Sequence, residues 1–234
     1  MANIILWLLD TLLRRYGIDL YPILGLHYIS ALDFHWWQPL TYMFMHGGFS
    51  HLFFNMFAVL MFGPVLEQEW GVKRYLIYYI ICGVGAAVIQ EVVWGLKIQS
   101  LLATYSAESV MLNYANQVVT IGASGAVFGI LLAFGWLFPN VPMYLFFIPI
   151  PIKARWMVIG YAAVELFAGF SSLPGDNVAH FAHLGGMLFG LILLLWWQYK
   201  DKLKFPRFWE KWFPASHDTE KNPDYSDYHY HKRL

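Results

Sequence analysis

Long apolar blocks separated by short polar segments dominate the chain. A membrane-spanning helix needs roughly 20 mainly apolar residues. Five segments reach or approach that length: Phe49–Leu66, Tyr75–Leu96, Val118–Phe138, Met157–Leu173 and Val178–Trp197. A sixth apolar stretch, Ile4–Leu13, is too short to span a bilayer by itself. The pattern predicts an all-α polytopic membrane protein whose first helix is short or atypical.

Composition supports this class. Hydrophobic residues make up 59% of the chain and charged residues 13%, a balance typical of integral membrane proteins whose main surroundings are lipid. The formal net charge of zero argues against nucleic acid as a partner. Polar residues return at Gln198, so we expect a transmembrane domain over 1–197 and a non-membrane tail over 198–234. Cys82 is the single cysteine, which excludes an intrachain disulfide, and we expect it to pack as a small apolar residue.

Lysine and arginine predict the orientation of the bundle. The chain has 15 Lys and Arg residues. All of them except Arg14, Arg15 and Lys97 lie between the first and second long spans, between the third and fourth, or after the last. Because cytoplasmic loops are enriched in Lys and Arg, the C-terminus is expected in the cytosol. The spans that begin near Phe49 and Val118 then start on the outer side, and so does the last span. Arg14 and Arg15 do not fit this orientation. A multi-pass protein of a prokaryotic inner membrane is the expected setting.

Polar residues gather near the outer starts of three spans. The segment "HGGFSHLFFN" places His46 just before one span and His51 and Asn55 on one face of the helix. The segment "VVTIGASG" places Ser124 about six residues, or roughly 9 Å, into a second. The segment "VAHFAHLGG" places His183 about five residues into a third. Since all three spans are expected to begin outside, these side chains would share one layer.

Each of these residues has an ordinary structural interpretation. A lone serine in a span usually bonds its own helix backbone, and a lone histidine usually packs in the bundle. Together they supply a nucleophile, a candidate base and two side-chain donors, which is the set that acyl transfer requires. The same three segments contain no Asp or Glu at this depth, so we expect a dyad of Ser124 and His183. Glu91 and Glu165, towards the outer ends of the other two spans, are expected to serve buried hydrogen bonding or to lie at the interface rather than act in catalysis.

Small residues favour close contact between the helices that carry the serine and the histidine. The glycines beside Ser124 are Gly122, Gly125 and Gly129, and those below His183 are Gly186 and Gly190. Glycine-lined faces let helices approach closely, as a serine–histidine hydrogen bond demands. Phe128, one turn below Ser124, either packs against the imidazole or is an ordinary core aromatic.

The motifs "HGGFSHLFFN", "GASG" and "AHLGGMLFG" closely resemble those of the rhomboid family of intramembrane serine proteases, over Trp36 to about Trp197. The resemblance implies a six-helix bundle that cleaves transmembrane segments of membrane-protein substrates near the outer face. Because the sequence offers a serine and a histidine but no metal cluster, we expect cleavage without metal or cofactor. It also implies roles for particular residues. Ser124 would be the nucleophile and His183 the base, with His51 and Asn55 around the oxyanion. His180 and His46 would lie next to these residues and hold them in position without reacting themselves.

Two departures from the family pattern stand out. Many members carry Trp-Arg in the first loop, where this chain has Trp37-Gln38, and the first helix is normally a full span. Two other functions remain open. One is a catalytically inactive rhomboid-like protein that binds membrane clients, against which the retention of Ser124 and His183 speaks. The other is a transporter or channel, which the sequence does not favour because it shows neither broken half-helices nor repeats.

Overall fold

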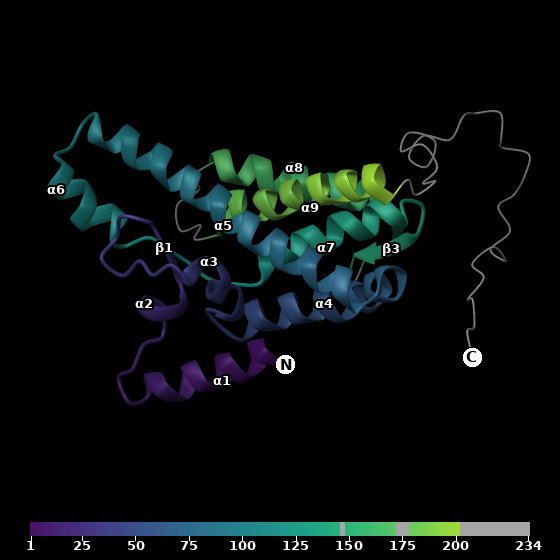
Figure 1. The fold of residues 1–234 in the computed structure, drawn as a ribbon, viewed down its shortest axis with the longest axis horizontal. Helices are drawn as coiled ribbons and strands as arrows, with labels where there is room; N and C mark the ends of the chain where they lie inside the picture. Colours follow the sequence, from purple (N-terminus) through teal and green to yellow (C-terminus); the bar gives the residue numbers. More distant parts are fainter. Residues whose placement is uncertain (146–147, 172–177, 202–234) are drawn as a thin grey trace, which may run out of the picture.

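The computed structural model describes residues 1–145, 148–171 and 178–201. Five helices run side by side (Figure 1): α4 (Phe49–Trp70), α5 (Val72–Leu102), α7 (Ser124–Leu137), α8 (Ala154–Ser171) and α9 (His180–Asp201). The short elements that precede α7 gather at one end of this bundle: α2 (Tyr21–Leu24), β1 (Leu26–His27), α3 (Gln38–Thr41), the 3-10 turn η1 (Tyr42–Phe44), α6 (Ala107–Val110), the π-helical turn η2 (Met111–Ala115) and β2 (Val119–Thr120). This end carries the candidate chemistry.

Three predicted spans are confirmed by length and composition within the described residues. Phe49–Trp70, Val72–Leu102 and His180–Lys200 are long and apolar enough to cross a membrane. Helix α7 is apolar but has only 14 residues, and α8 has 18. The first helix, α1 (Ala2–Arg14), has 13 residues, or about 20 Å at 1.5 Å per residue. It is therefore shorter than the roughly 30 Å hydrocarbon core, as the sequence predicted.

The prediction that the third span begins at Val118 was wrong. Val119 and Thr120 form β2, which pairs antiparallel with β1. Gly122 then adopts a φ of +127°, and α7 begins only at Ser124. Consecutive β-branched residues favour extended backbone, and an apolar run by itself does not distinguish a strand from a helix. Ser124 is thus the first residue of its helix, and the predicted depth of six helical residues does not hold.

A second departure from the all-α prediction lies between α7 and α8. Strands β3 (Pro142–Leu145) and β4 (Ile148–Lys153) form an antiparallel hairpin in which Pro142 pairs with Lys153. Over the residues that the structure describes, the protein is mostly helical with two small two-stranded sheets. At the C-terminal end, α9 continues to Asp201, past the predicted domain boundary at Trp197. The rest of the predicted tail lies outside the described residues.

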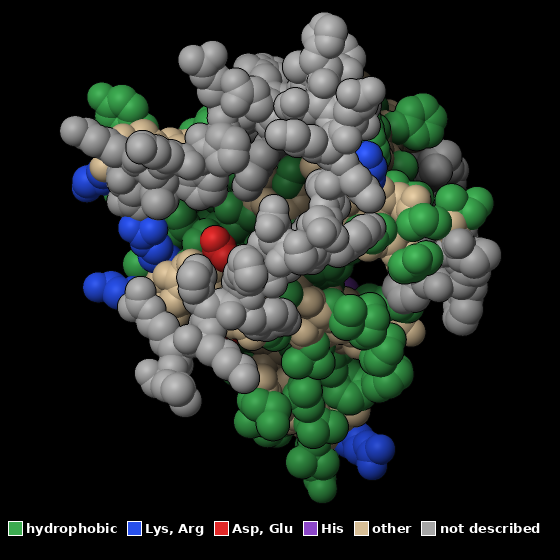
Figure 2. Space-filling model, turned by 90° about the vertical axis from the view of Figure 1, so that its right-hand side faces the viewer, with side chains coloured by type: hydrophobic (Ala, Val, Ile, Leu, Met, Phe, Trp, Pro, Cys, Tyr) green, Lys and Arg blue, Asp and Glu red, His purple; other side chains and the backbone are tan. Residues whose placement is uncertain are grey.

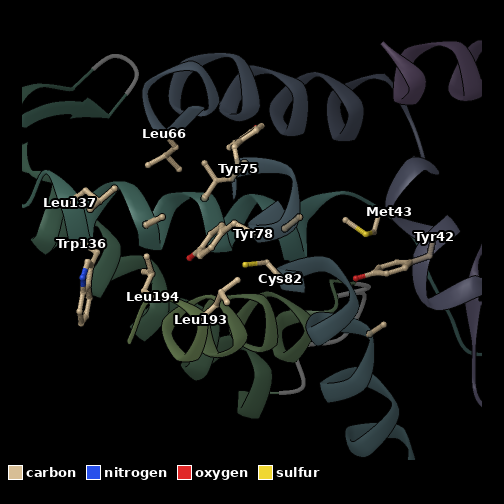
Figure 3. Packing of buried hydrophobic residues seen from close by; sticks show 14 of the residues in the cluster. Tyr42, Met43, Leu66, Tyr75, Tyr78, Cys82, Trp136, Leu137, Leu193 and Leu194 are labelled. Atoms are coloured by element: carbon tan, nitrogen blue, oxygen red, sulfur yellow. The ribbon is translucent and has the colours of Figure 1, made fainter. Parts of the chain in front are cut away.

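Helices α5, α7 and α9 pack against one another, and most residues of α7 are buried. Tyr78 and Cys82 of α5 point into this core (Figure 3). The Tyr78 hydroxyl donates to the Gly129 carbonyl at 3.0 Å, and the Tyr42 hydroxyl donates to the Gly83 carbonyl at 2.7 Å. Buried hydroxyl groups are therefore paired where glycines leave the backbone open. The burial of Cys82 confirms its predicted packing role.

Gln38, which stands where the rhomboid resemblance leads us to expect arginine, is completely buried and joins three parts of the first loop. Its Oε1 accepts the His27 backbone N–H at 3.2 Å. Its Nε2 donates to the carbonyls of Pro22 and Asp33 at 3.1 and 2.6 Å. A neutral carboxamide thus holds this loop together through both its donor and acceptor groups.

Replacing Gln38 by methionine is expected to destabilise the protein markedly. Methionine keeps the approximate volume, but it leaves the His27 N–H and two carbonyls without their partner, at about 1–3 kcal/mol for each unsatisfied buried group. Gln90 offers a matched control in α5, because it is also buried and its Oε1 has no hydrogen-bond partner among the described residues. Thermal unfolding in detergent should show a large loss for Gln38→Met and little change for Gln90→Met. Equal losses would contradict this role for Gln38.

Candidate active site

Helices α4, α7 and α9 all begin at the same end of the bundle (Figure 1). This arrangement brings the first turns of the three helices together, and with them His51, Ser124 and His183. The predicted gathering of polar residues at one end is therefore present. It arises from the shared helix starts, not from matched depths inside three long helices.

Ser124 and His183 are in direct contact. The Ser124 Oγ lies 2.7 Å from the His183 Nε2, and His183 is buried. Gly125 and Gly186 make this approach possible, since a Cβ on Gly186 would overlap the backbone carbonyl of Gly125. The predicted glycine contact between the two helices is confirmed for this pair.

Two further glycines of the predicted seam, Gly129 and Gly190, pack mainly elsewhere. A Cβ on Gly190 would meet the Tyr78 hydroxyl and the Cys82 sulfur of α5, and a Cβ on Gly129 would overlap Cys82 itself. Gly190 therefore accommodates α5 and not α7, contrary to the prediction. Helix α9 contacts both α5 and α7 closely, so its glycines divide between two neighbours.

Phe128 packs on the histidine, which decides between the two predicted roles. Its ring is stacked on the His183 imidazole with a centroid distance of 4.4 Å and an interplanar angle of 8°. Phe128 lies one turn after Ser124 on α7. The ring limits rotation of the imidazole about χ2 and keeps the histidine facing the serine.

Glu165 of α8 completes a chain of contacts that the sequence interpretation did not include. Its Oε2 lies 2.9 Å from the Nδ1 of His183 and 2.6 Å from the Nδ1 of His180. The expectation of buried hydrogen bonding for Glu165 is confirmed, but its partners belong to the site. Glu165 was already recognised towards the outer end of its span, and intramembrane acids are uncommon and usually paired, but the sequence did not show that its partners are the two histidines. Glu91, by contrast, accepts the Ile29 backbone N–H at 3.0 Å, away from the serine.

His51 lies beside the loop that leads into α7. A Cβ on Gly122 would lie 2.7 Å from the His51 Nε2, and the φ of +127° at Gly122 also favours glycine. His46 contacts the His51 ring edge-on at 5.0 Å. Burial, and secondarily His51, lowers the pKa of His46 to about 4, so His46 is neutral near pH 7 and places no positive charge beside His51.

Asn55 lies one turn further along α4. Its Nδ2 donates to the His51 backbone carbonyl at 2.8 Å. A carboxamide has two N–H groups, so this bond uses one of them. Asn55 lines the same cavity as Ser124 and His51. Its predicted donor role therefore remains compatible with the site.

A cavity of about 980 Å³ is lined by residues of α4, α7, β3 and α8 and includes Ser124 in its wall. Its polar side chains include Ser50, His51, Asn55 and Ser124. The apolar and aromatic lining includes Phe54, Phe57, Ala58, Met61, Phe62, Val65, Val127, Phe128, Leu131, Phe134, Val141, Pro142, Met143 and Met157. An apolar cavity with polar groups near the serine suits a ligand that is itself largely apolar.

Comparison with known proteins agrees with this architecture. The family model for the rhomboid domain matches residues 33–199, which include every residue of the site described above. The chain belongs to the rhomboid family. The resemblance expected from the three motifs is therefore confirmed, and with it an integral membrane protein of the rhomboid type.

Several curated rhomboid proteins are similar to the chain. "RHOMBOID-like protein 5" of Arabidopsis thaliana is 32% identical over 166 residues, covering 70% of this chain and 46% of the relative. "Putative rhomboid protease YdcA" of Bacillus subtilis is 30% identical over 164 residues, covering 68% and 65%. "Rhomboid protein 1, mitochondrial" of Saccharomyces cerevisiae is 30% identical over 149 residues, covering 64% and 38%. The chain thus spans less than two thirds of the length of each of these rhomboid relatives.

Proposed function

We propose that the protein is an intramembrane serine endopeptidase that cleaves transmembrane segments of membrane-protein substrates near the outer membrane face. The observation that carries this proposal is the 2.7 Å contact between the Ser124 Oγ and the His183 Nε2 at an apolar cavity. Nucleophile and base within hydrogen-bond reach are the signature of serine hydrolases. Membership of the rhomboid family supports the same activity.

The reaction follows from these two groups. His183 Nε2 accepts the hydroxyl proton as the Ser124 Oγ attacks the carbonyl carbon of the substrate peptide bond. The tetrahedral intermediate then collapses, the C–N bond breaks, and His183 returns the proton to the leaving amine. A water molecule attacks the resulting ester, with His183 again as the base. Its proton returns to the Ser124 Oγ as the new carboxyl terminus leaves.

The start of α7 supports stabilisation of the oxyanion. The first backbone N–H groups of a helix have no partner within the helix and lie at the positive end of its dipole. Ser124 is the first residue of α7, so the oxyanion that develops on the substrate carbonyl oxygen when the Ser124 Oγ attacks would lie next to these groups. In this proposal, His51 and the second N–H of Asn55 add donors from α4. Donors already in place when the charge develops are among the largest contributions to catalysis.

The cavity supports a transmembrane peptide as the substrate. Its apolar walls come from α4 on one side and from α7, α8 and β3 on the others. Side chains of a substrate helix that unwinds near Ser124 would remain in apolar surroundings there. A soluble, highly charged peptide would gain little from the same walls.

The basic residues support an orientation with the site opening outwards and the C-terminus in the cytosol. Figure 2 views the end of the bundle where α4 and α9 end, and Lys and Arg side chains lie around that face. Arg74 lies over Trp197 at 5.6 Å and Lys200 over Trp196 at 4.8 Å, a pairing typical of a membrane interface. A prokaryotic inner membrane is the proposed location.

Cysteine labelling tests this orientation. In a Cys82→Ala background, Ala107→Cys is expected to react with an impermeant maleimide added to intact cells, and Lys73→Cys only after lysis. Both positions are exposed, so accessibility within the protein is matched. Labelling of Lys73→Cys from outside, with protection of Ala107→Cys, would invert the proposed topology.

A cleavage assay tests the activity. Purified protein in liposomes is incubated with a single-span substrate, and the products are identified by mass spectrometry. We expect one cut near the outer end of the span, blocked by a serine-directed phosphonate and unaffected by a chelator. Binding of the substrate without any product would instead support the alternative, an inactive rhomboid-like protein that binds membrane clients.

A further inference from the structure

One oxygen of Glu165 lies between the Nδ1 atoms of two histidines. The distances are 2.9 Å to His183 and 2.6 Å to His180, and each of the three side chains is at most 14% exposed. Glu165 comes from α8, whereas both histidines come from the first turn of α9. Contact between these helices therefore places a carboxylate directly behind the imidazole that faces Ser124.

We propose that Glu165 is a positioning residue for His183, so that the reacting group is a Ser124–His183–Glu165 chain and not an isolated dyad. This inference rests on the proposed protease function. His180 shares the same oxygen and holds the carboxylate in place from the other side. Glu165 touches neither the substrate nor the serine, and it acts entirely through the imidazole.

The hydrogen bond fixes the tautomer of His183. An ionised carboxylate only accepts hydrogen bonds, so a proton on the His183 Nδ1 points at Glu165 and the Nε2 lone pair faces the Ser124 hydroxyl. When Nε2 takes the serine proton, the ring becomes a cation 2.9 Å from the carboxylate oxygen. Glu165 remains ionised throughout and stabilises this cation, as the buried carboxylate does in other serine proteases.

Phe128 and Glu165 constrain the imidazole in different ways. The stacked Phe128 ring limits the plane of the imidazole, but both tautomers and a flipped ring fit equally well against an apolar face. Glu165 distinguishes them because it requires a donor at the Nδ1 position. The two contacts together specify both the orientation of the ring and the position of its proton.

The same three side chains also have the composition of a metal site. Their candidate ligand atoms lie within 4.8 Å of one another. Two ligands at about 2.0–2.1 Å from a tetrahedral zinc ion would be roughly 3.3 Å apart. The observed 2.6 and 2.9 Å separations are shorter and match charge-assisted N–H···O hydrogen bonds. The geometry therefore favours hydrogen bonds between the two histidines and Glu165 over a metal ion bound by all three.

The test compares Glu165→Gln, Glu165→Ala and Glu165→Asp with the wild type in the liposome assay. Glutamine keeps the size and an accepting oxygen but removes the charge. We expect kcat to fall roughly 10- to 100-fold for Glu165→Gln, with KM and melting temperature little changed. Glu165→Ala should lose at least as much, and Glu165→Asp should recover part of the rate. The serine-directed phosphonate should also label Ser124 more slowly in these variants, most slowly in Glu165→Ala and least slowly in Glu165→Asp.

Glu91→Gln is the matched control. Glu91 is a second partly buried carboxylate, but it bonds the Ile29 backbone and is not in contact with either histidine. This variant should cleave at the wild-type rate. Wild-type kcat and labelling rate in the folded fraction of all three Glu165 variants would overturn the inference. Micromolar zinc that inhibits the wild type but not His180→Ala would overturn it too, in favour of a metal site.

These outcomes are distinct from failure of the proposed function. If the wild type does not cleave, or if Ser124→Ala cleaves normally, the protease assignment itself is wrong. If the wild type cleaves through Ser124 and the Glu165 variants match it, only the positioning role is wrong.

Discussion

Replacing Ser124 with alanine is expected to abolish cleavage of a single-span substrate while the protein remains folded. Loss of the nucleophile in serine proteases lowers kcat by about 10⁴- to 10⁶-fold. The structural cost should be small, because the variant loses one hydrogen bond, to His183, worth about 1 kcal/mol. Cleavage is measured in liposomes, and folding is measured by thermal unfolding.

Ser171→Ala provides the control for this experiment. Its Oγ donates to the Phe167 carbonyl one turn earlier in α8, at 2.7 Å. This is the ordinary role of a serine in a membrane helix. Ser171→Ala should cleave like the wild type. Normal cleavage by both serine variants would exclude Ser124 as the nucleophile.

The second prediction with a large expected effect distinguishes the roles of the two histidines at the start of α9. His183→Ala is expected to lose essentially all cleavage, since a positioned general base contributes about 10²- to 10⁴-fold. His180→Ala should retain a measurable fraction, because His180 contacts Glu165 and its ring centroid lies 6.3 Å from that of His183.

The ranking of the two variants is the informative result. Both substitutions remove a histidine from the same turn and leave the same methyl group, so general effects on α9 are matched. Rates should be measured at equal amounts of folded protein. Greater loss in His180→Ala than in His183→Ala would show that the base has been assigned to the wrong residue.

Much of the bundle and part of the site were predictable from sequence. Long apolar runs predicted the confirmed spans within α4, α5 and α9. The common end of three spans brought Ser124 and His183 together, and glycines at 125 and 186 indicated where the helices touch. Periodic hydrophobicity and small-residue spacing are local signals, which is why these features could be found without a structure.

Features that depend on packing between distant segments were not predictable in the same way. The start of α7 was placed six residues too early. Val119 and Thr120 fit the end of an apolar span as well as a strand, and only their pairing with β1 identifies them as a strand. Glu165 was separated from the site because the register of α8 against α9 is not encoded in either helix alone. Gln38 was recognised as a departure, but its three hydrogen-bond partners lie in different parts of the loop.

The most direct test of the central claim is the site of covalent modification by a serine-directed phosphonate. Peptide mapping after complete inhibition should find a single adduct on Ser124, and His183→Ala should prevent or greatly slow its formation. An adduct on another serine, or full cleavage by a protein modified completely at Ser124, would contradict the serine mechanism.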